Sequence, residues 1–273
     1  NIYNELNSHI YSFDKIYSFK KINNDNNNIF VNLLNNVKQR NSNLEYNISE
    51  SLIDLNNLNY SNLINLQKMN YKLDTIFLLN ISIKTLIEQH NYMYTYKKSI
   101  INNCNINNII TNVCNDVNCI SNRIYNKSVN FRILNNTDVH IKYINYHIYY
   151  IINEIIKNSS ISHLVNNVDD YINITIFNGN EDVIIKISDL GKGFLRSDIN
   201  KIFTYSYSTY KDNITDEYEI LNIPIISGLG FGLPLSRIYA RYYGGDLCIV
   251  PIEKIGTDVY IYLNKFQNTE QIL

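Results

Sequence analysis

The stretch Ser188-Asp-Leu-Gly-Lys-Gly-Phe194 follows an apolar run, Val183 to Ile187, that is typical of a β-strand. It places one carboxylate, Asp189, at the end of that strand, and two glycines follow at a spacing of two. Glycine lets the backbone adopt positive φ angles and approach a ligand closely. A carboxylate beside such backbone can accept a hydrogen bond from an exocyclic amine, as adenine offers. Taken alone, however, the pattern is explained better by a plain turn.

The composition excludes several classes of protein. The chain has 273 residues, 45% of them hydrophobic, and a net charge of −1, so it has room for one large domain or two modest ones. This balanced charge predicts neither a nucleic-acid partner nor a membrane partner. Apolar runs are far shorter than the roughly 18 residues that a membrane span needs. The chain begins with Asn1 rather than methionine, so we expect a fragment or a processed form.

The cysteines do not suggest a metal site. They lack Cys-x-x-Cys spacing and a paired histidine, so we expect reduced thiols and an intracellular compartment. The four positions are Cys104, Cys114, Cys119 and Cys248.

The glycines and prolines divide the chain into two regions. All nine glycines lie between Gly179 and Gly256, whereas residues 1–178 contain neither glycine nor proline. Because apolar residues recur there at spacings of three and four, we expect a helical bundle over residues 1–100. An asparagine-rich stretch at 101–108 marks the expected boundary. A second domain at 105–266 and a tail at 267–273 would follow.

The second domain mixes helical and strand patterns. We expect helices at 109–124, 146–164, 199–204 and 228–243, and strands at 129–134, 172–177, 183–188, 246–251 and 257–263. The connection at 205–227 is long and polar, which is typical of a functional lid or a disordered segment. Helices on one face of a mainly antiparallel sheet would make an α+β, two-layer domain.

One expected helix carries a pair of polar residues suited to chemistry. Glu154 and Asn158 are four residues apart, so they lie one helical turn apart on one face, and we expect that stripe, which includes His147, to lie opposite the apolar face. An amide oxygen such as that of Asn158 is a ligand that Mg²⁺ accepts, and a carboxylate one turn away can take a proton from a hydroxyl. A solvated helix face remains the simpler interpretation of this pair alone.

The run Gly228-Leu-Gly-Phe-Gly232 precedes the last expected helix, and exposed N–H groups at a helix N-terminus favour phosphates. A flexible hinge is an equal alternative. Neither a Rossmann fingerprint nor a P-loop fits the spacing. Ser208 and Thr209 could bond phosphate or ribose, although such pairs are common in loops. His90 lacks the surroundings of a phosphoacceptor, so we expect a structural histidine.

The order of these motifs resembles a known superfamily. The boxes Glu154-x-x-x-Asn158, Asp189-x-Gly-x-Gly193, Ser208-Thr209 and Gly228-x-Gly-x-Gly232 resemble the GHKL (Bergerat-fold) ATPases. In detail, Phe203 to Thr209, Gly230 to Pro234, Gly256 to Leu263 and the helical segment Leu73 to His90 resemble the mitochondrial 2-oxoacid dehydrogenase kinases. The resemblance implies a helical bundle that serves regulation or docking, followed by a Bergerat-type α/β sandwich that binds ATP.

The resemblance also implies roles for individual residues. Asp189 would bind the adenine amine, Asn158 would hold Mg²⁺, and Glu154 would be the catalytic base for a substrate serine. The remaining residues implied in ATP binding are Gly191, Gly193, Ser208, Thr209, Gly228, Leu229, Gly230, Phe231, Gly232, Leu233 and Thr257. K⁺ is a second ion to consider.

The implied function is an ATP-dependent protein-serine kinase of the mitochondrial matrix. It would phosphorylate and inactivate the decarboxylase component of a 2-oxoacid dehydrogenase complex, branched-chain or pyruvate, and would contact the lipoyl-bearing core. A homodimer is implied by the family, but the absence of tryptophan argues against the tail-mediated kind. Tyr150, where pyruvate-type members often have histidine, favours the branched-chain type.

Three departures leave an alternative function open. Ile161 and Leu190 replace arginines that are usual in the family, and Lys192 replaces a glycine. An ATP-binding scaffold that docks on the complex without catalysis is therefore a second hypothesis. A histidine kinase is a weaker third one.

Overall fold

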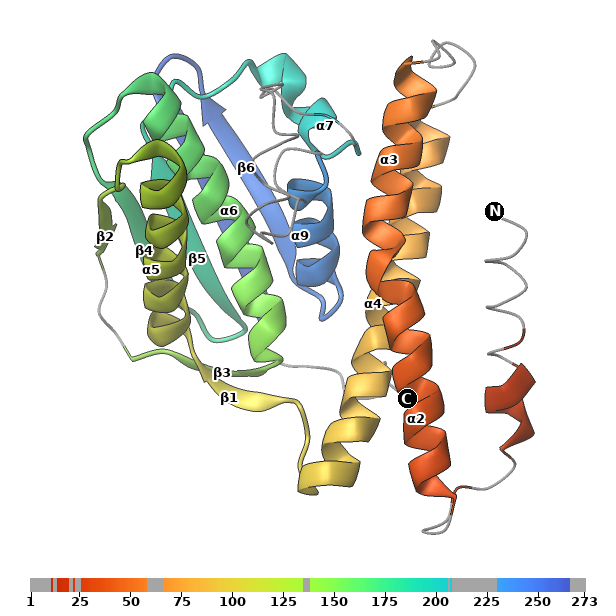
Figure 1. Cartoon of the computed structure of the whole chain (residues 1–273). Coiled ribbons are helices and arrows are strands. Elements are labelled where there is room, and N and C mark those ends of the chain that lie inside the picture. The colour runs from red at the N-terminus through yellow and green to blue at the C-terminus, as the bar shows by residue number, and fades with distance from the viewer. Residues whose placement is uncertain are drawn as a thin grey trace. The chain divides into compact units, whose positions relative to one another are not determined.

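The structure is a computed structural model that describes residues 11, 14–19, 22, 26–57, 66–134, 138–205, 207 and 230–265. The chain forms two compact units, residues 1–63 with 75–100, and residues 64–74 with 101–273 (Figure 1). The helices are α2 (Asn27–Arg40), α3 (Leu44–Asn57), α4 (Leu66–Tyr96), α5 (Ile106–Tyr125), α6 (Asn145–Asn166), α7 (Ile199–Ile202) and α9 (Gly232–Arg241), with short 3₁₀ turns at Asn41–Asn43 and Arg196–Asp198. The strands are β1 (Asn102–Asn105), β2 (Phe131–Ile133), β3 (His140–Tyr143), β4 (Ile172–Asn178), β5 (Asp182–Asp189), β6 (Asp246–Ile252) and β7 (Gly256–Asn264).

The first unit is helical, as the absence of glycine and proline predicted. Phe30, Leu34 and Val37 share one face of α2 and pack with Ile87 of α4 in one buried cluster. Burying a side chain of this kind contributes roughly 1.5–3 kcal/mol. The unit is therefore held together by the apolar faces of its helices rather than by helix propensity alone.

The second unit contains a five-stranded sheet with the order β2-β4-β5-β7-β6. Its only parallel pair among the described strands is β2–β4, and the other neighbours are antiparallel. The helices α5, α6 and α9 lie across one face of this sheet, with α6 between the other two (Figure 1). The predicted α+β domain, with helices on one face of a mainly antiparallel sheet, is confirmed.

A separate two-stranded sheet, β1 with β3, was not predicted. Asparagine is depleted in strands, and β1 lies in the asparagine-rich stretch that we expected to mark the domain boundary. In the structure Cys104 of β1 pairs with Ile141 of β3, and both side chains are buried. Burial against a distant partner therefore outweighs the low strand propensity of the segment.

The position of α6 corrects one expectation about its polar stripe. His147 is fully buried and Glu154 is 5% exposed, although both were expected opposite the apolar face. The reason is that α6 is covered by the sheet on one side and by α5 and α9 on its flanks. Among the predicted stripe residues, Asn158 is exposed.

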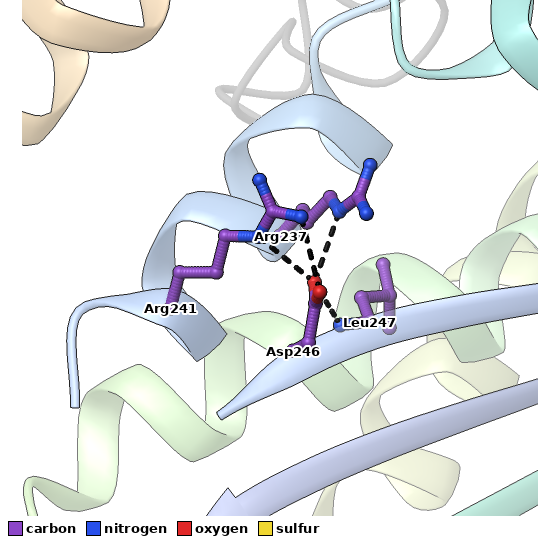
Figure 2. Close-up of polar contacts among 4 residues, drawn as sticks. All are labelled: Arg237, Arg241, Asp246 and Leu247. Atoms are coloured by element: carbon purple, nitrogen blue, oxygen red, sulfur yellow. Dashed lines mark hydrogen bonds and ion pairs between the residues drawn. The ribbon is translucent and has the colours of Figure 1, made fainter. Parts of the chain in front are cut away.

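The junction of α9 with β6 is an ion-pair cluster (Figure 2). Arg237 Nε and Arg241 Nε lie 2.9 Å and 3.0 Å from Oδ1 of Asp246, which also accepts the N–H of Leu247. Burial alone would raise the pKa of Asp246, but the two guanidinium groups outweigh it and lower that pKa to about 2.

Gly244, with φ of 80°, follows the end of α9 where a helix-ending glycine was expected.

Other expectations concern segments and side chains outside the core. The segment 208–229, which includes most of the expected lid and the start of the glycine run, lies outside the described residues. Within them α9 begins at Gly232. The cysteines are free thiols, two buried and two exposed. No helix in the described part of the chain is both long and apolar enough to span a membrane.

Candidate functional site

Strand β5 turns Asp189 toward the helices. Every second residue of the strand is buried, beginning with Val183 and continuing through Ile185 and Ile187 to Asp189. Because side chains alternate between the two faces of a sheet, the carboxylate ends the same inward row as the isoleucines. Asp189 is only 7% exposed, and it is the last residue of the strand.

The Asp189 carboxylate is held by three donors. Oδ1 accepts the N–H of Gly191 at 3.0 Å and Oδ2 accepts the hydroxyl of Ser159 at 3.2 Å, while the backbone of Thr257 on β7 also bonds this group. Burial raises the pKa of Asp189, and these hydrogen bonds oppose the shift. A carboxylate offers about four acceptor positions, so a further donor such as an exocyclic amine can be accommodated.

One face of α6 binds the chain that follows β5. Besides the Ser159 contact, Ser162 Oγ donates to the carbonyl of Gly191 at 2.7 Å, and Nε2 of His163 accepts the N–H of Leu190 at 2.9 Å. The acceptor role of Nε2 requires a neutral ring, and burial lowers the pKa of His163 in agreement. These three residues were not predicted from the sequence. Their spacing of three and four was the available signal, since it places them on one helical face.

Glu154 and Asn158 lie on the same helix, one turn apart. The buried carboxylate of Glu154 pairs with Lys157 Nζ at 2.5 Å. A side chain at Gly232, the first residue of α9, would collide with Oε2 of Glu154. The glycine at this position therefore leaves room for the carboxylate of Glu154, a reason different from the phosphate contact that we expected.

The other glycines of the site are close-packing positions. A side chain on Gly191 would collide with Ser162, and one on Gly256 would collide with the backbone of Asp189. Gly193 has φ of 58°, and a Cβ there would lie 2.5 Å from the carbonyl oxygens of Gly256 and Ile252. The expected positive φ is thus observed at Gly193, whereas Gly191 is required by its contact with α6.

The remaining predicted residues fall into two groups. Gly230 has φ of 76°, Phe231 is buried with its ring centroid 5.3 Å from that of Tyr205, and Leu233 is partly buried. The residues outside the described part of the chain are Ser208, Thr209, Gly228 and Leu229.

Two observations concern ions and phosphoacceptors. The described residues contain no group of three or more His, Cys, Asp or Glu side chains that could hold a metal. An amide oxygen such as that of Asn158 would have to share a cation with oxygens from a ligand. Nε2 of His90 lies 3.2 Å from Oδ1 of Asn27, and the His90 ring packs edge-on against Phe30. These contacts are typical of a structural histidine.

Two family models match the chain. Residues 145–267 match the model described as histidine kinase-, DNA gyrase B- and HSP90-like ATPase. Residues 1–115 match the model described as mitochondrial branched-chain alpha-ketoacid dehydrogenase kinase. The first match contains Glu154, Asn158, Asp189 and the described glycines.

Individual relatives are similar over most of the chain. A mitochondrial pyruvate dehydrogenase (acetyl-transferring) kinase of Arabidopsis thaliana is 32% identical over 230 residues, which cover 77% of this chain and 61% of the relative. The corresponding kinase of Schizosaccharomyces pombe is 30% identical over 88% of this chain and 60% of its own length. Isozyme 4 of Homo sapiens is 28% identical over 86% of this chain and 61% of its own length. The chain therefore spans about three fifths of the length of these relatives.

Proposed function

Because the chain belongs to the mitochondrial 2-oxoacid dehydrogenase kinase family of the GHKL ATPases, we propose that it is an ATP-dependent protein-serine kinase. Its substrate would be the decarboxylase component of a mitochondrial 2-oxoacid dehydrogenase complex, which phosphorylation inactivates. The observation that carries the proposal is the arrangement of α6 and β5, where one helix both bears Glu154 and Asn158 and binds the Asp189 carboxylate.

Asp189 would accept the amine of adenine. Its carboxylate is buried, and the three donors described above orient it while leaving capacity for one more. A buried acceptor that is already oriented binds a donor without a further ordering cost. The serine and histidine contacts of α6 keep the segment Asp189–Gly191 in place.

Asn158 would hold Mg²⁺ through its amide oxygen, together with phosphate oxygens of ATP. The ion would supply charge neutralisation of the phosphates, and the exposure of Asn158 suits a residue that meets a ligand. Gly230, Gly232 and Leu233 would approach the phosphates, with Gly228, Leu229, Ser208 and Thr209 closing the site. K⁺ is proposed as a second ion.

Glu154 would accept the proton of the substrate serine hydroxyl as the oxygen attacks the terminal phosphoryl group. The ion pair with Lys157 and the contact with Gly232 hold its carboxylate in one orientation. Phosphoryl transfer depends mainly on positioning and charge neutralisation, which an oriented carboxylate and Mg²⁺ would supply.

The test is transfer of labelled phosphate from Mg-ATP to purified decarboxylase components. We expect label on serine of the branched-chain component, the pyruvate component or both. Branched-chain transfer would agree with Tyr150 and the family model over residues 1–115, and pyruvate transfer would agree with the names of the three relatives described above. Absence of transfer to either component contradicts the proposal.

Glu154→Gln separates catalysis from binding. The variant keeps the shape of the side chain but removes the base, so transfer should fall by about 10²-fold or more while ATP still binds. Asp189→Ala is the matched variant that should lose ATP binding. An ATP-binding scaffold, suggested by Ile161 and Leu190 in place of arginines, predicts instead that Glu154→Gln changes no activity.

The setting of the kinase is also part of the proposal. The relatives are named as mitochondrial enzymes, which supports a mitochondrial location, and we assign the matrix because the proposed substrate complex resides there. The lipoyl-bearing core is the proposed docking partner. A homodimer is proposed as the assembly.

A further inference from the structure

Tyr205 follows α7 and contacts the beginning of α4. Its hydroxyl donates to Oδ1 of Asp74 at 2.6 Å, and its backbone N–H lies 3.5 Å from Oδ1 of Asn70. Both acceptors belong to residues 64–74, which are part of the second compact unit together with Tyr205 itself. The phenol is only 5% exposed. A distance of 2.6 Å is typical of a hydroxyl that donates to a carboxylate.

The aromatic ring of Tyr205 contacts a residue beside the proposed catalytic site. Its ring packs against Phe231, with 5.3 Å between the ring centroids, and Phe231 is 1% exposed. Phe231 directly precedes Gly232, where the carboxylate of Glu154 leaves no room for a side chain. A contiguous series of contacts therefore runs from the exposed residue Asp74 through the buried rings of Tyr205 and Phe231 to the first residue of α9.

The helix that bears Asp74 continues into the other unit. α4 extends from Leu66 to Tyr96, and residues 75–100 belong to the first unit. The pair Leu73-Asp74 was part of the family resemblance, but none of the proposed catalytic roles uses it.

We propose that Asp74 and Tyr205 are a positioning pair that couples the beginning of α4 to nucleotide binding at α9. This inference rests on the proposed ATP-binding function. Neither residue contacts the reacting atoms. The hydrogen bond to Asp74 fixes the ring of Tyr205, which packs against Phe231. Phe231 in turn fixes the position of the next residue, Gly232, beside the carboxylate of Glu154. Coupling of this kind is reciprocal, so bound nucleotide should in turn stabilise residues 66–74.

The test compares variants of the pair in the complete chain. Tyr205→Phe keeps the ring and removes the hydroxyl, Asp74→Ala removes the acceptor, and Asp74→Asn keeps an acceptor oxygen. The matched control is Tyr149→Phe, because Tyr149 donates to Asp116 at the same 2.6 Å distance on an exposed part of the same unit. Calorimetric titration with Mg-ATP measures affinity, and hydrogen exchange followed by mass spectrometry measures protection of residues 66–74.

We expect Tyr205→Phe and Asp74→Ala each to weaken Mg-ATP binding about 5- to 10-fold, the lower part of the usual range for coupled sites. The double variant should be no weaker than either single one, because both changes remove the same hydrogen bond. Asp74→Asn should retain most of the affinity, and Tyr149→Phe all of it. Nucleotide should slow exchange of residues 66–74 in the wild type but not in Tyr205→Phe.

In the kinase assay the pair should act on binding rather than on chemistry. KM for ATP should rise in Tyr205→Phe while kcat at saturating ATP stays within about twofold, since a uniform loss of binding raises KM alone. Affinities equal to the wild type, or additive losses in the double variant, would overturn the inference. If the wild type binds Mg-ATP with these couplings but transfers no phosphate, the kinase proposal fails and the coupling stands. A wild type that binds no nucleotide contradicts both.

Discussion

Lys192 has a backbone φ of 59°, in the left-handed region that glycine occupies without steric cost. It stands between Gly191 and Gly193, where the family resemblance implies a third glycine. A side chain with a Cβ in this conformation costs roughly 1–2 kcal/mol. Lys192 is exposed, so no packing contact of the core requires its side chain.

The prediction at this scale is that Lys192→Gly stabilises the folded chain by about 0.5–1 kcal/mol. The gain is the relief of the left-handed strain minus the extra conformational entropy that glycine loses on folding. Urea unfolding measures it as a higher midpoint at an unchanged slope. Lys192→Ala is the control, since it removes the charge and keeps the strain. Equal stability of the two variants would contradict the interpretation.

At the scale of elements, α6 organises the site. It bears Glu154 and Asn158, and its serine and histidine side chains bind all three residues of the segment Asp189–Gly191. The two adjacent serines of this helix differ in their surroundings. Ser159 Oγ donates to Asp189, whereas Ser160 Oγ is buried without a hydrogen-bond partner in the described structure.

Ser159→Ala and Ser160→Ala are therefore predicted to differ. Loss of a hydrogen bond to a charged group costs about 1.5–3 kcal/mol, whereas deletion of an unpaired buried hydroxyl is nearly neutral or stabilising. Because the Ser159 hydroxyl opposes the raised pKa of Asp189, its removal should raise that pKa further. Calorimetric titration across the acid range should then show ATP affinity declining at a higher pH in Ser159→Ala than in Ser160→Ala. If ATP affinity declines at the same pH in both variants, Ser159 does not have this role.

At the scale of the whole molecule, a buried histidine makes folding sensitive to acid. His147 is fully buried among the rings of Tyr146, Tyr239, Tyr242 and Tyr243, and neither ring nitrogen has a partner in the described structure. Burial lowers its pKa from 6.5 to about 3. Between pH 6.5 and about pH 3, His147 therefore binds a proton in the unfolded chain but not in the folded chain.

The stability contributed by neutral His147 is fully present above pH 6.5 and is lost as pH falls toward 3. A difference of one bound proton corresponds to a slope of about 1.4 kcal/mol per pH unit. We predict that His147→Phe lowers the slope of the unfolding free energy between pH 4 and 6 by about that amount. Urea unfolding followed by circular dichroism at several pH values measures both slopes. Parallel curves for variant and wild type would show that His147 is protonated in the folded state.

The sequence was sufficient for features that depend on neighbouring residues. The apolar run from Val183 to Ile187 predicted β5, and the helical spacing of the isoleucines predicted α6. The helical character of the first unit followed from the absence of glycine and proline. Asp189, Glu154 and Asn158 could be selected because each lies at a recognisable place in such a local pattern.

Contacts between distant residues came only from the folded arrangement. Ser159 and Asp189 are 30 residues apart, and the collision that requires Gly232 involves Glu154 on another helix. The burial of His147 and the pairing of β1 with β3 likewise depend on what packs against them. Periodicity specifies which face of an element is apolar. It does not specify which distant residues pack against that face, because that depends on the packing of all the elements together.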